Sequence, residues 1–161
     1  MRSRTANWFE CKIRYEKTME DGLQKKVTEA YTVDALSFSE AEERITEEMS
    51  SYISGEFTVQ DIKKAPYSEI FFSDLEMADR WYKAKLQFIT IDEKTEKEKR
   101  SSVNYLVQAG TLNGAVKSID EFMGTTNNDY VIVSVCETTL MDVFEYKKKE
   151  TKENAQPEFE E

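Results

Sequence analysis

The sequence predicts an α+β fold built from two pseudo-symmetric ββαβ(β) repeats, in which antiparallel strands form one or two sheets and two helices pack on them. Two observations predict this fold. The first is an internal duplication, because Trp8 and Lys12 recur as Trp81 and Lys85, at an offset of 73 residues. The second is the hydrophobic period within each copy, which changes from two residues to about 3.6 and back again.

The duplication is clearest in the middle of each copy, where the offset becomes 74. Identical residues there are Tyr31, Val33, Ala35, Ala41, Ile45, Glu47 and Met49 in the first copy and Tyr105, Val107, Ala109, Ala115, Ile119, Glu121 and Met123 in the second. The offset then returns to 73 and pairs Phe71 with Phe144. The copies therefore span residues 7–73 and 79–146, and we expect them to form one globular unit.

Each repeat begins with a strand and a hairpin. Apolar and polar residues alternate in "FECKIRY" from Phe9 to Tyr15, which is typical of a half-buried strand. Asp21-Gly22 indicates a hairpin turn before the alternating residues 27–33. The second copy has "IDEKTEKEKR" at this place and lacks a glycine, so we expect its hairpin to be looser.

A helix follows the hairpin in each repeat. Ala41, Ile45 and Met49 lie at i, i+4 and i+8 and form one apolar face. Ser37, followed three residues later by Glu40, matches the capping box at a helix N-terminus. The same spacing in the second copy predicts the partner helix.

The second helix should run from about Leu112 to Met123, with Gly124 at its end. After the helices, "EFTVQDIKKA" and "YSEIFF" in the first copy and "DYVIVSVCET" and "LMDVFEY" in the second predict one or two further strands. Pro66 marks a break or an edge between the first two. Short connections favour antiparallel pairing.

Composition excludes several classes of function. The chain has no histidine, which excludes catalytic triads and metal sites that depend on histidine. Cys11 and Cys136 are too few for a disulfide framework or a cysteine-built metal site. Glycine-rich phosphate loops and nucleophile elbows are missing from the sequence. We therefore expect no catalytic residue, no cofactor and no metal, and a protein that is not an enzyme.

Charge and hydropathy bear on location and partners. The net charge of −10 argues against a surface that grips phosphates everywhere, although a local basic face stays open. No apolar run reaches the length of a membrane span, and residues 1–7 do not begin a signal peptide. We expect a cytoplasmic protein that binds a protein partner, does not enter a membrane and is able to form homo-oligomers.

The outward side of the opening strand in each repeat is a candidate ligand face. Aromatic rings flanked by cations suit single-stranded nucleic acid, because bases stack on the rings and cations follow the phosphates. The candidate residues are Trp8, Lys12, Arg14, Trp81, Lys83 and Lys85. The alternative is that both tryptophans are buried anchors for packing.

Residues 147–161 form a charged tail without periodicity, which predicts disorder. Its end, with Pro157, Phe159, Glu160 and Glu161, is similar to the acidic C-terminal tips by which single-stranded DNA-binding proteins recruit partners. The alternative is a tail that only improves solubility.

Longer stretches carry a family resemblance. They are "WFECKIRYEKTMEDGLQKKVTEAYTVDALSFSEAEERITEEM", "SGEFTVQDIKKAPYSEIFFS", "DRWYKAKLQFITIDEK" and "ETTLMDVFEY". The chain resembles a family of small uncharacterised proteins from gut Bacteroidetes and their phages, carried as a domain of unknown function. The resemblance implies a phage or mobile-element origin and supplies no catalytic residues.

Three hypotheses of function remain. The first is a non-catalytic binding or adaptor protein of phage or mobile-element origin. The second is a single-stranded nucleic-acid-binding protein whose acidic tail recruits a partner. The third is an enzyme that uses carboxylates alone.

Overall fold

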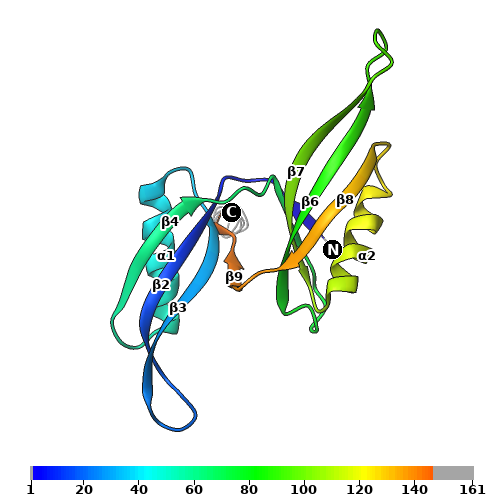
Figure 1. Cartoon of the computed structure of the whole chain (residues 1–161). Coiled ribbons are helices and arrows are strands. Elements are labelled where there is room, and N and C mark those ends of the chain that lie inside the picture. Colours follow the sequence, from blue (N-terminus) through cyan, green and yellow to red (C-terminus); the bar gives the residue numbers. More distant parts are fainter. Residues whose placement is uncertain (1, 147–161) are drawn as a thin grey trace, which may run out of the picture. The chain divides into compact units, whose positions relative to one another are not determined.

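The structure, a computed structural model, describes residues 2–146 (Figure 1). Its elements follow in the order β1 (Arg2–Arg4), β2 (Trp8–Thr18), β3 (Gln24–Asp34), α1 (Phe38–Tyr52), β4 (Phe57–Lys64), β5 (Glu69–Phe72), β6 (Arg80–Ile91), β7 (Glu98–Ala109), α2 (Leu112–Met123), β8 (Asp129–Glu137) and β9 (Leu140–Phe144). The α+β class and the repeated order of strands and helices are as the sequence predicts.

The chain divides into two compact units, each with its own sheet. Unit 1 contains the N-terminal residues through Ala6 together with Pro66–Thr139, and its strand order is β1-β5-β7-β6-β8. Unit 2 contains Asn7–Ala65 and residues 140–146, and its strand order is β4-β2-β3-β9. Pro66, expected to mark a break, is the residue at which the chain passes into unit 1.

The last strand of each repeat belongs to the sheet of the other repeat. Strand β5 from the first repeat pairs in parallel with β7, so that Ile70 lies opposite Leu106. Strand β9 from the second repeat pairs in parallel with β3, so that Val143 lies opposite Thr32. The compact units therefore have other boundaries than the sequence repeats 7–73 and 79–146.

Parallel pairing corrects the expectation of purely antiparallel sheets. The remaining ladders are antiparallel, as β2 with β3 and β6 with β7 show. Short connections predict antiparallel pairing only between strands that are neighbours in the chain. Strands β5 and β9 do not pair with the strands that precede them, because each crosses to the other unit.

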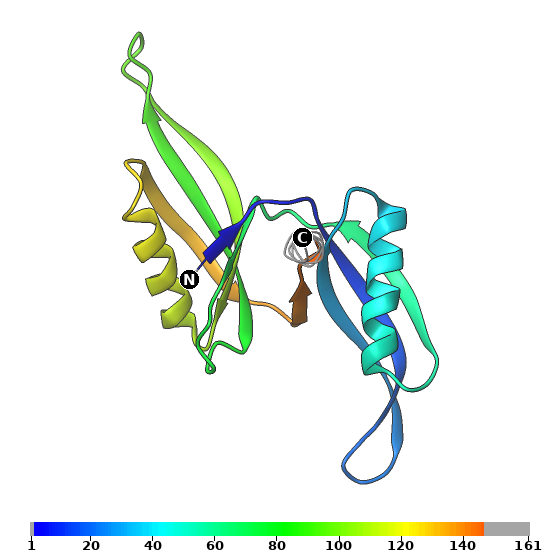
Figure 2. The same cartoon turned by 180° about the vertical axis from the view of Figure 1, so that it is seen from behind.

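Each helix covers one face of one sheet, as the view from behind shows for α1 (Figure 2). The predicted apolar face of α1 is fully buried, since Ala41, Ile45 and Met49 are 0% exposed. It packs with residues of β2 that include Phe9 and Ile13. In unit 1 the corresponding residues of α2 pack against β6 and β7. Among the described elements, no helix of the same unit lies on the other face of each sheet.

The second hairpin is as regular as the first, contrary to expectation. Strands β6 and β7 stay paired as far as Ile91 and Glu98. Asp92 closes the turn with its backbone, which accepts the N–H of Glu96 at 2.7 Å, and with its side chain, which accepts the N–H of Lys94 at 2.9 Å. Glu96 has a positive φ of 57°, and Gly22 has a positive φ of 82° in the first hairpin. An aspartate side chain accepts a backbone N–H in both turns, since Asp21 accepts that of Leu23 at 3.0 Å in the first hairpin.

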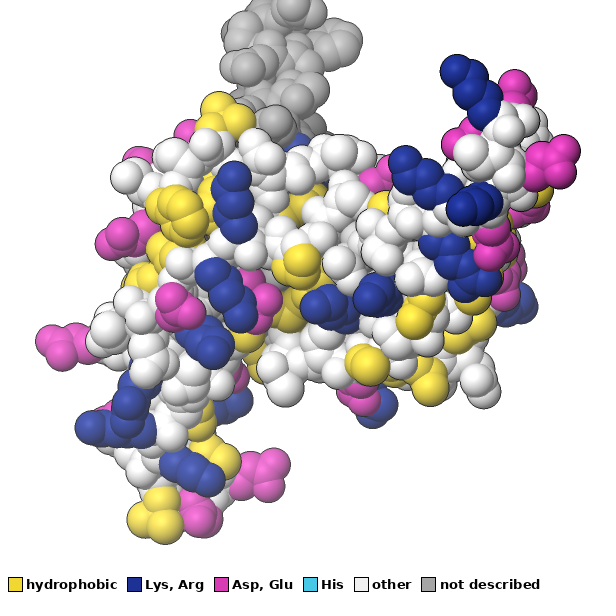
Figure 3. All heavy atoms as spheres, turned by 45° about the horizontal axis from the view of Figure 1, so that its top comes forward, with side chains coloured by type: hydrophobic (Ala, Val, Ile, Leu, Met, Phe, Trp, Pro, Cys, Tyr) yellow, Lys and Arg dark blue, Asp and Glu magenta, His cyan; other side chains and the backbone are white. Residues whose placement is uncertain are grey.

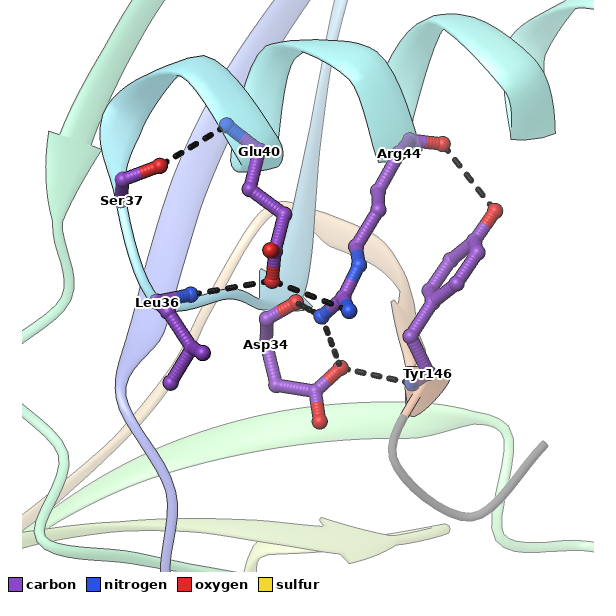
Figure 4. A network of polar contacts seen from close by, with 6 residues as sticks. All are labelled: Asp34, Leu36, Ser37, Glu40, Arg44 and Tyr146. Atoms are coloured by element: carbon purple, nitrogen blue, oxygen red, sulfur yellow. Dashed lines mark hydrogen bonds and ion pairs between the residues drawn. The ribbon is translucent and has the colours of Figure 1, made fainter. Parts of the chain in front are cut away.

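A polar network holds β9 in unit 2 (Figure 4). Asp34, at the end of β3, is fully buried and accepts the backbone N–H of Tyr146 through Oδ1 at 2.6 Å. Arg44 of α1 donates to the carbonyl of Asp34 at 2.6 Å and pairs with Glu40 at 2.9 Å. The Tyr146 hydroxyl donates to the carbonyl of Arg44 at 3.1 Å. Ser37 caps the same helix by accepting the N–H of Glu40, as predicted.

Unit 1 has the equivalent bond with a different side chain. The backbone N–H of Ser73, just after β5, donates to Oε1 of Gln108 at 2.9 Å. Gln108 then donates through Nε2 to the carbonyl of Ala78 at 3.1 Å. In both units, therefore, a side chain near the end of the second strand of the repeat holds the received strand.

Candidate binding surfaces

The faces of the sheets opposite the helices are the candidate ligand surfaces. Figure 3 shows one face of the molecule, on which Lys and Arg side chains lie among Asp and Glu side chains and uncharged ones. Alternation along β2 places Lys12 and Arg14 on the open face of unit 2, and alternation along β6 places Lys83 and Lys85 on that of unit 1. All four side chains are exposed, so each strand presents cations to solvent.

The two tryptophans do not belong to these exposed surfaces. Trp8 is 2% exposed and Trp81 is 3% exposed. A ring must be accessible if a base is to stack on it. The candidate ligand face is therefore reduced to its cations, and the interpretation of both tryptophans as packing anchors fits their burial.

The tryptophans mark the points where the chain leaves one unit for the other. The carbonyl of Trp8 accepts the N–H of Ala65 at 2.9 Å, immediately before the crossing at Pro66. The carbonyl of Trp81 accepts the N–H of Thr138 at 2.9 Å, just before the chain crosses to β9. The two tryptophans therefore occupy equivalent backbone positions, each next to a crossing of the chain.

In unit 2 the open face carries both signs of charge. Lys12 lies opposite Asp61 on the neighbouring strand β4. Two further cross-strand positions join a carboxylate to a lysine, namely Glu10 with Lys63 and Glu16 with Lys26. Opposite charges at such positions compensate one another. The basic character of this face is therefore weak.

In unit 1 the cations of the open face have uncharged neighbours. Lys83 lies opposite Cys136 on β8 and Leu106 on β7. Lys85 lies opposite Ser134 and Asn104. No carboxylate faces either lysine across the sheet, so the open face of unit 1 is the more attractive to an anion.

A surface groove of about 600 Å³ lies in unit 2 between the β2–β3 hairpin and the loop before β4. Arg14 and Lys26 line it together with Glu16 and Glu56. Because cations and carboxylates alternate around it, the groove does not favour a ligand of one charge.

Burial is the main cause of the raised pKa values of Cys11 and Tyr15 in unit 2. Burial raises the pKa of the Cys11 thiol to about 12, and the charges of Glu10 and Asp61 add to the effect. Burial also raises the pKa of Tyr15 to about 12, and its hydroxyl donates to Glu29 at 2.7 Å. These groups stay protonated at neutral pH, which suits packing and not nucleophilic chemistry.

Three further expectations from the sequence concern a membrane span, a metal site and the C-terminal tail. Among residues 2–146, no helix is long and apolar enough to cross a membrane. The same residues contain no group of three or more Cys, Asp and Glu side chains placed to hold a metal ion. The tail residues Pro157, Phe159, Glu160 and Glu161 lie outside the described part of the chain.

Two features were not recognised from the sequence. The first is the network around Arg44, which could have been suspected because Arg44 lies four residues after Glu40 and next to the buried position Ile45. The second is the uncharged run from Tyr130 to Cys136 in β8, which forms an edge of the sheet in unit 1. Composition identifies such a run, whereas only the strand order identifies an edge.

Comparison with known proteins yields one match. The model of a family described as Domain of unknown function (DUF4494) matches residues 7–146. A search of curated proteins and a search of solved structures each found no match. The match covers all the described elements except β1.

Proposed function

Since the chain belongs to the DUF4494 family of unknown function, we propose, from its surfaces, that it is a non-catalytic binding or adaptor protein of the cytoplasm. One observation carries this proposal. In the part of the chain that the structure describes, each sheet has a helix on one face, while its other face presents exposed cations such as Lys12 and Lys83. Charged sheet faces of this kind fix the orientation of a protein partner. The further proposal of a phage or mobile-element origin depends on the sequence resemblance alone.

The products of adjoining genes are the partners to test. Each would be co-expressed with the full chain and analysed by size-exclusion chromatography with light scattering. We expect one of them to form a complex of defined stoichiometry, and K12E/R14E or K83E/K85E to weaken it. If no adjoining product binds, or if both charge reversals leave a complex unchanged, the adaptor proposal through these faces is wrong.

A second candidate function is the binding of single-stranded nucleic acid by the open face of unit 1. The observation in its favour is that Lys83 and Lys85 face uncharged side chains across the sheet. Uncompensated cations attract phosphates, and the affinity then falls with salt. Base stacking on Trp81 is not part of this version, because the ring is buried.

The two repeats provide a matched control for this candidate. Anisotropy of a fluorescent dT oligonucleotide would be measured at increasing salt. We expect K83E/K85E to reduce the affinity about tenfold and K12E/R14E to change it by less than about threefold. Equal effects of the two double variants, or the absence of salt-dependent binding, would contradict this candidate.

A further inference from the structure

The described residues present four sheet edges, and these differ in length and charge. Strand β1 has three residues and β9 has five, so both edges are short. Strand β4 has eight residues and carries Asp61, Lys63 and Lys64. Short strands and charged side chains are the usual means by which proteins prevent pairing at an edge. Three of the four edges are therefore protected.

Strand β8 lacks both kinds of protection. It has nine residues, pairs within residues 2–146 with β6 alone, and is uncharged from Tyr130 to Cys136. Val131 is 37% exposed and Val133 is 48% exposed, so apolar side chains accompany the unpaired backbone. β-branched residues such as these favour the extended conformation that a paired strand needs.

A register shift does not explain the difference between β8 and β4. The pairing of β8 with β6 shifts in register between Lys85 and Leu86 of β6. The pairing of β4 with β2 shifts at the same place in the repeat, between Lys12 and Ile13 of β2. Bulges of this kind bend an edge in both units alike. The two edges differ in where their charges lie, because β4 has Asp61 within the strand whereas β8 has charges only at its end residues, Asp129 and Glu137.

We propose that the free edge of β8 pairs with β8 of a second copy of this chain, in an antiparallel arrangement that joins two five-stranded sheets. This inference goes beyond the proposed function, because the partner is the chain itself. Backbone hydrogen bonds between the two edges provide affinity, as in other cases of strand addition. Contacts of Val131 and Val133 across the pair add the burial of apolar area.

The charge pattern of β8 is compatible with a second copy as the occupant, because its two carboxylates, Asp129 and Glu137, stand at the ends of the strand. Each chain has a net charge of −10, so two copies repel each other wherever their carboxylates meet. Pairing that places Ile132 opposite its own counterpart puts Asp129 opposite Val135 and Glu137 opposite Asn127. No two carboxylates then face each other, and β8 is an edge at which two acidic copies can approach.

Sedimentation velocity of the full chain over a range of concentrations tests the proposal. We expect a concentration-dependent dimer that V131K/V133K weakens about tenfold or more, since like charges would face each other across the pair. Both positions are exposed, so circular dichroism of this variant should match that of the original chain.

The control is T58K/Q60K, which alters the positions of β4 that correspond to Val131 and Val133 in the duplication. This variant should dimerise as the original chain does. Amide hydrogen exchange gives an independent measurement, because amides of β8 should become more protected at higher concentration while those of β4 stay unchanged. A chain that remains monomeric, or a dimer that both double variants weaken equally, would overturn the proposal and leave the edge to a strand from another protein.

Discussion

Unit 1 and unit 2 hold the strand that each receives through the same backbone hydrogen bond, made to different side chains. In unit 2 the acceptor is the carboxylate of Asp34, which also interacts with Arg44. In unit 1 the acceptor is the side-chain amide of Gln108, whose own N–H group donates to the carbonyl of Ala78. The two units therefore share the backbone hydrogen bond that holds the received strand. The acceptor is a carboxylate paired with Arg44 in unit 2 and a neutral amide in unit 1.

The helices are where the two units are most alike, so their cores should give matching and large effects. Ile45 and Ile119 occupy corresponding positions and are both 0% exposed. Ile45→Ala and Ile119→Ala should each lower the free energy of unfolding by about 4 kcal/mol, because each leaves a cavity under a helix. Urea denaturation followed by circular dichroism measures both. Losses that differ by more than about twofold would show that the two cores are not equivalent.

The strand-holding residues should separate the units. Asp34→Ala should cost about 3 kcal/mol, because it removes the acceptor for Tyr146 and takes one carboxylate from the buried guanidinium of Arg44. Gln108→Ala should lower the free energy of unfolding by about 1.5 kcal/mol, because the backbone N–H of Ser73 loses its neutral acceptor. Unfolding in urea compares them. The conservative Asp34→Asn, which imitates Gln108, should fall between the two, and equal losses for both alanine variants would contradict the distinction.

Alkaline pH should destabilise unit 2 first. The pKa of Cys11 is raised from 9.0 to about 12 and that of Tyr15 from 10.0 to about 12. Above pH 9 the unfolded chain loses protons that the folded chain retains, so stability is complete below pH 9 and falls as the pH rises toward 12. In unit 1 burial also raises the pKa of Tyr105, but from 10.0, so that its contribution is lost later.

Urea midpoints at about pH 8 and about pH 10.5 measure this loss. Cys11→Ala removes the group that begins to titrate first, so its midpoint should fall less over this interval than that of the original chain. If the urea midpoint falls equally in Cys11→Ala and in the original chain, the Cys11 thiol does not contribute to the loss of stability at alkaline pH.

The smallest effect concerns the reactivity of the two cysteines, with no change in stability. Cys136 is exposed on β8, whereas Cys11 is buried in unit 2. In the folded chain a maleimide should modify Cys136 quickly and Cys11 only after unfolding, because a buried thiol with a raised pKa is neither accessible nor ionised. Mass spectrometry of peptides over time distinguishes the sites. Equal rates would mean that unit 2 opens readily.

Much of the candidate surface could be predicted from alternation along single strands. The period of two placed Lys12, Arg14, Lys83 and Lys85 on exposed faces, because side chains alternate in any strand. It could not predict which of these cations have compensating carboxylates, since Asp61 and Ser134 become neighbours only through cross-strand register. Nor could it show that both tryptophans are buried.

By itself, the sequence determined the local elements of this protein. The alternating runs, the apolar helix face with Ile45, the cap at Ser37 and the repeated order are consequences of short-range periodicity and backbone chemistry, which a segment carries with it. The tertiary structure decided where β5 and β9 go, that Asp34 meets Tyr146, and that β8 is left as an edge. These are long-range pairings, and a backbone N–H or C=O group carries no label for the strand that it will meet.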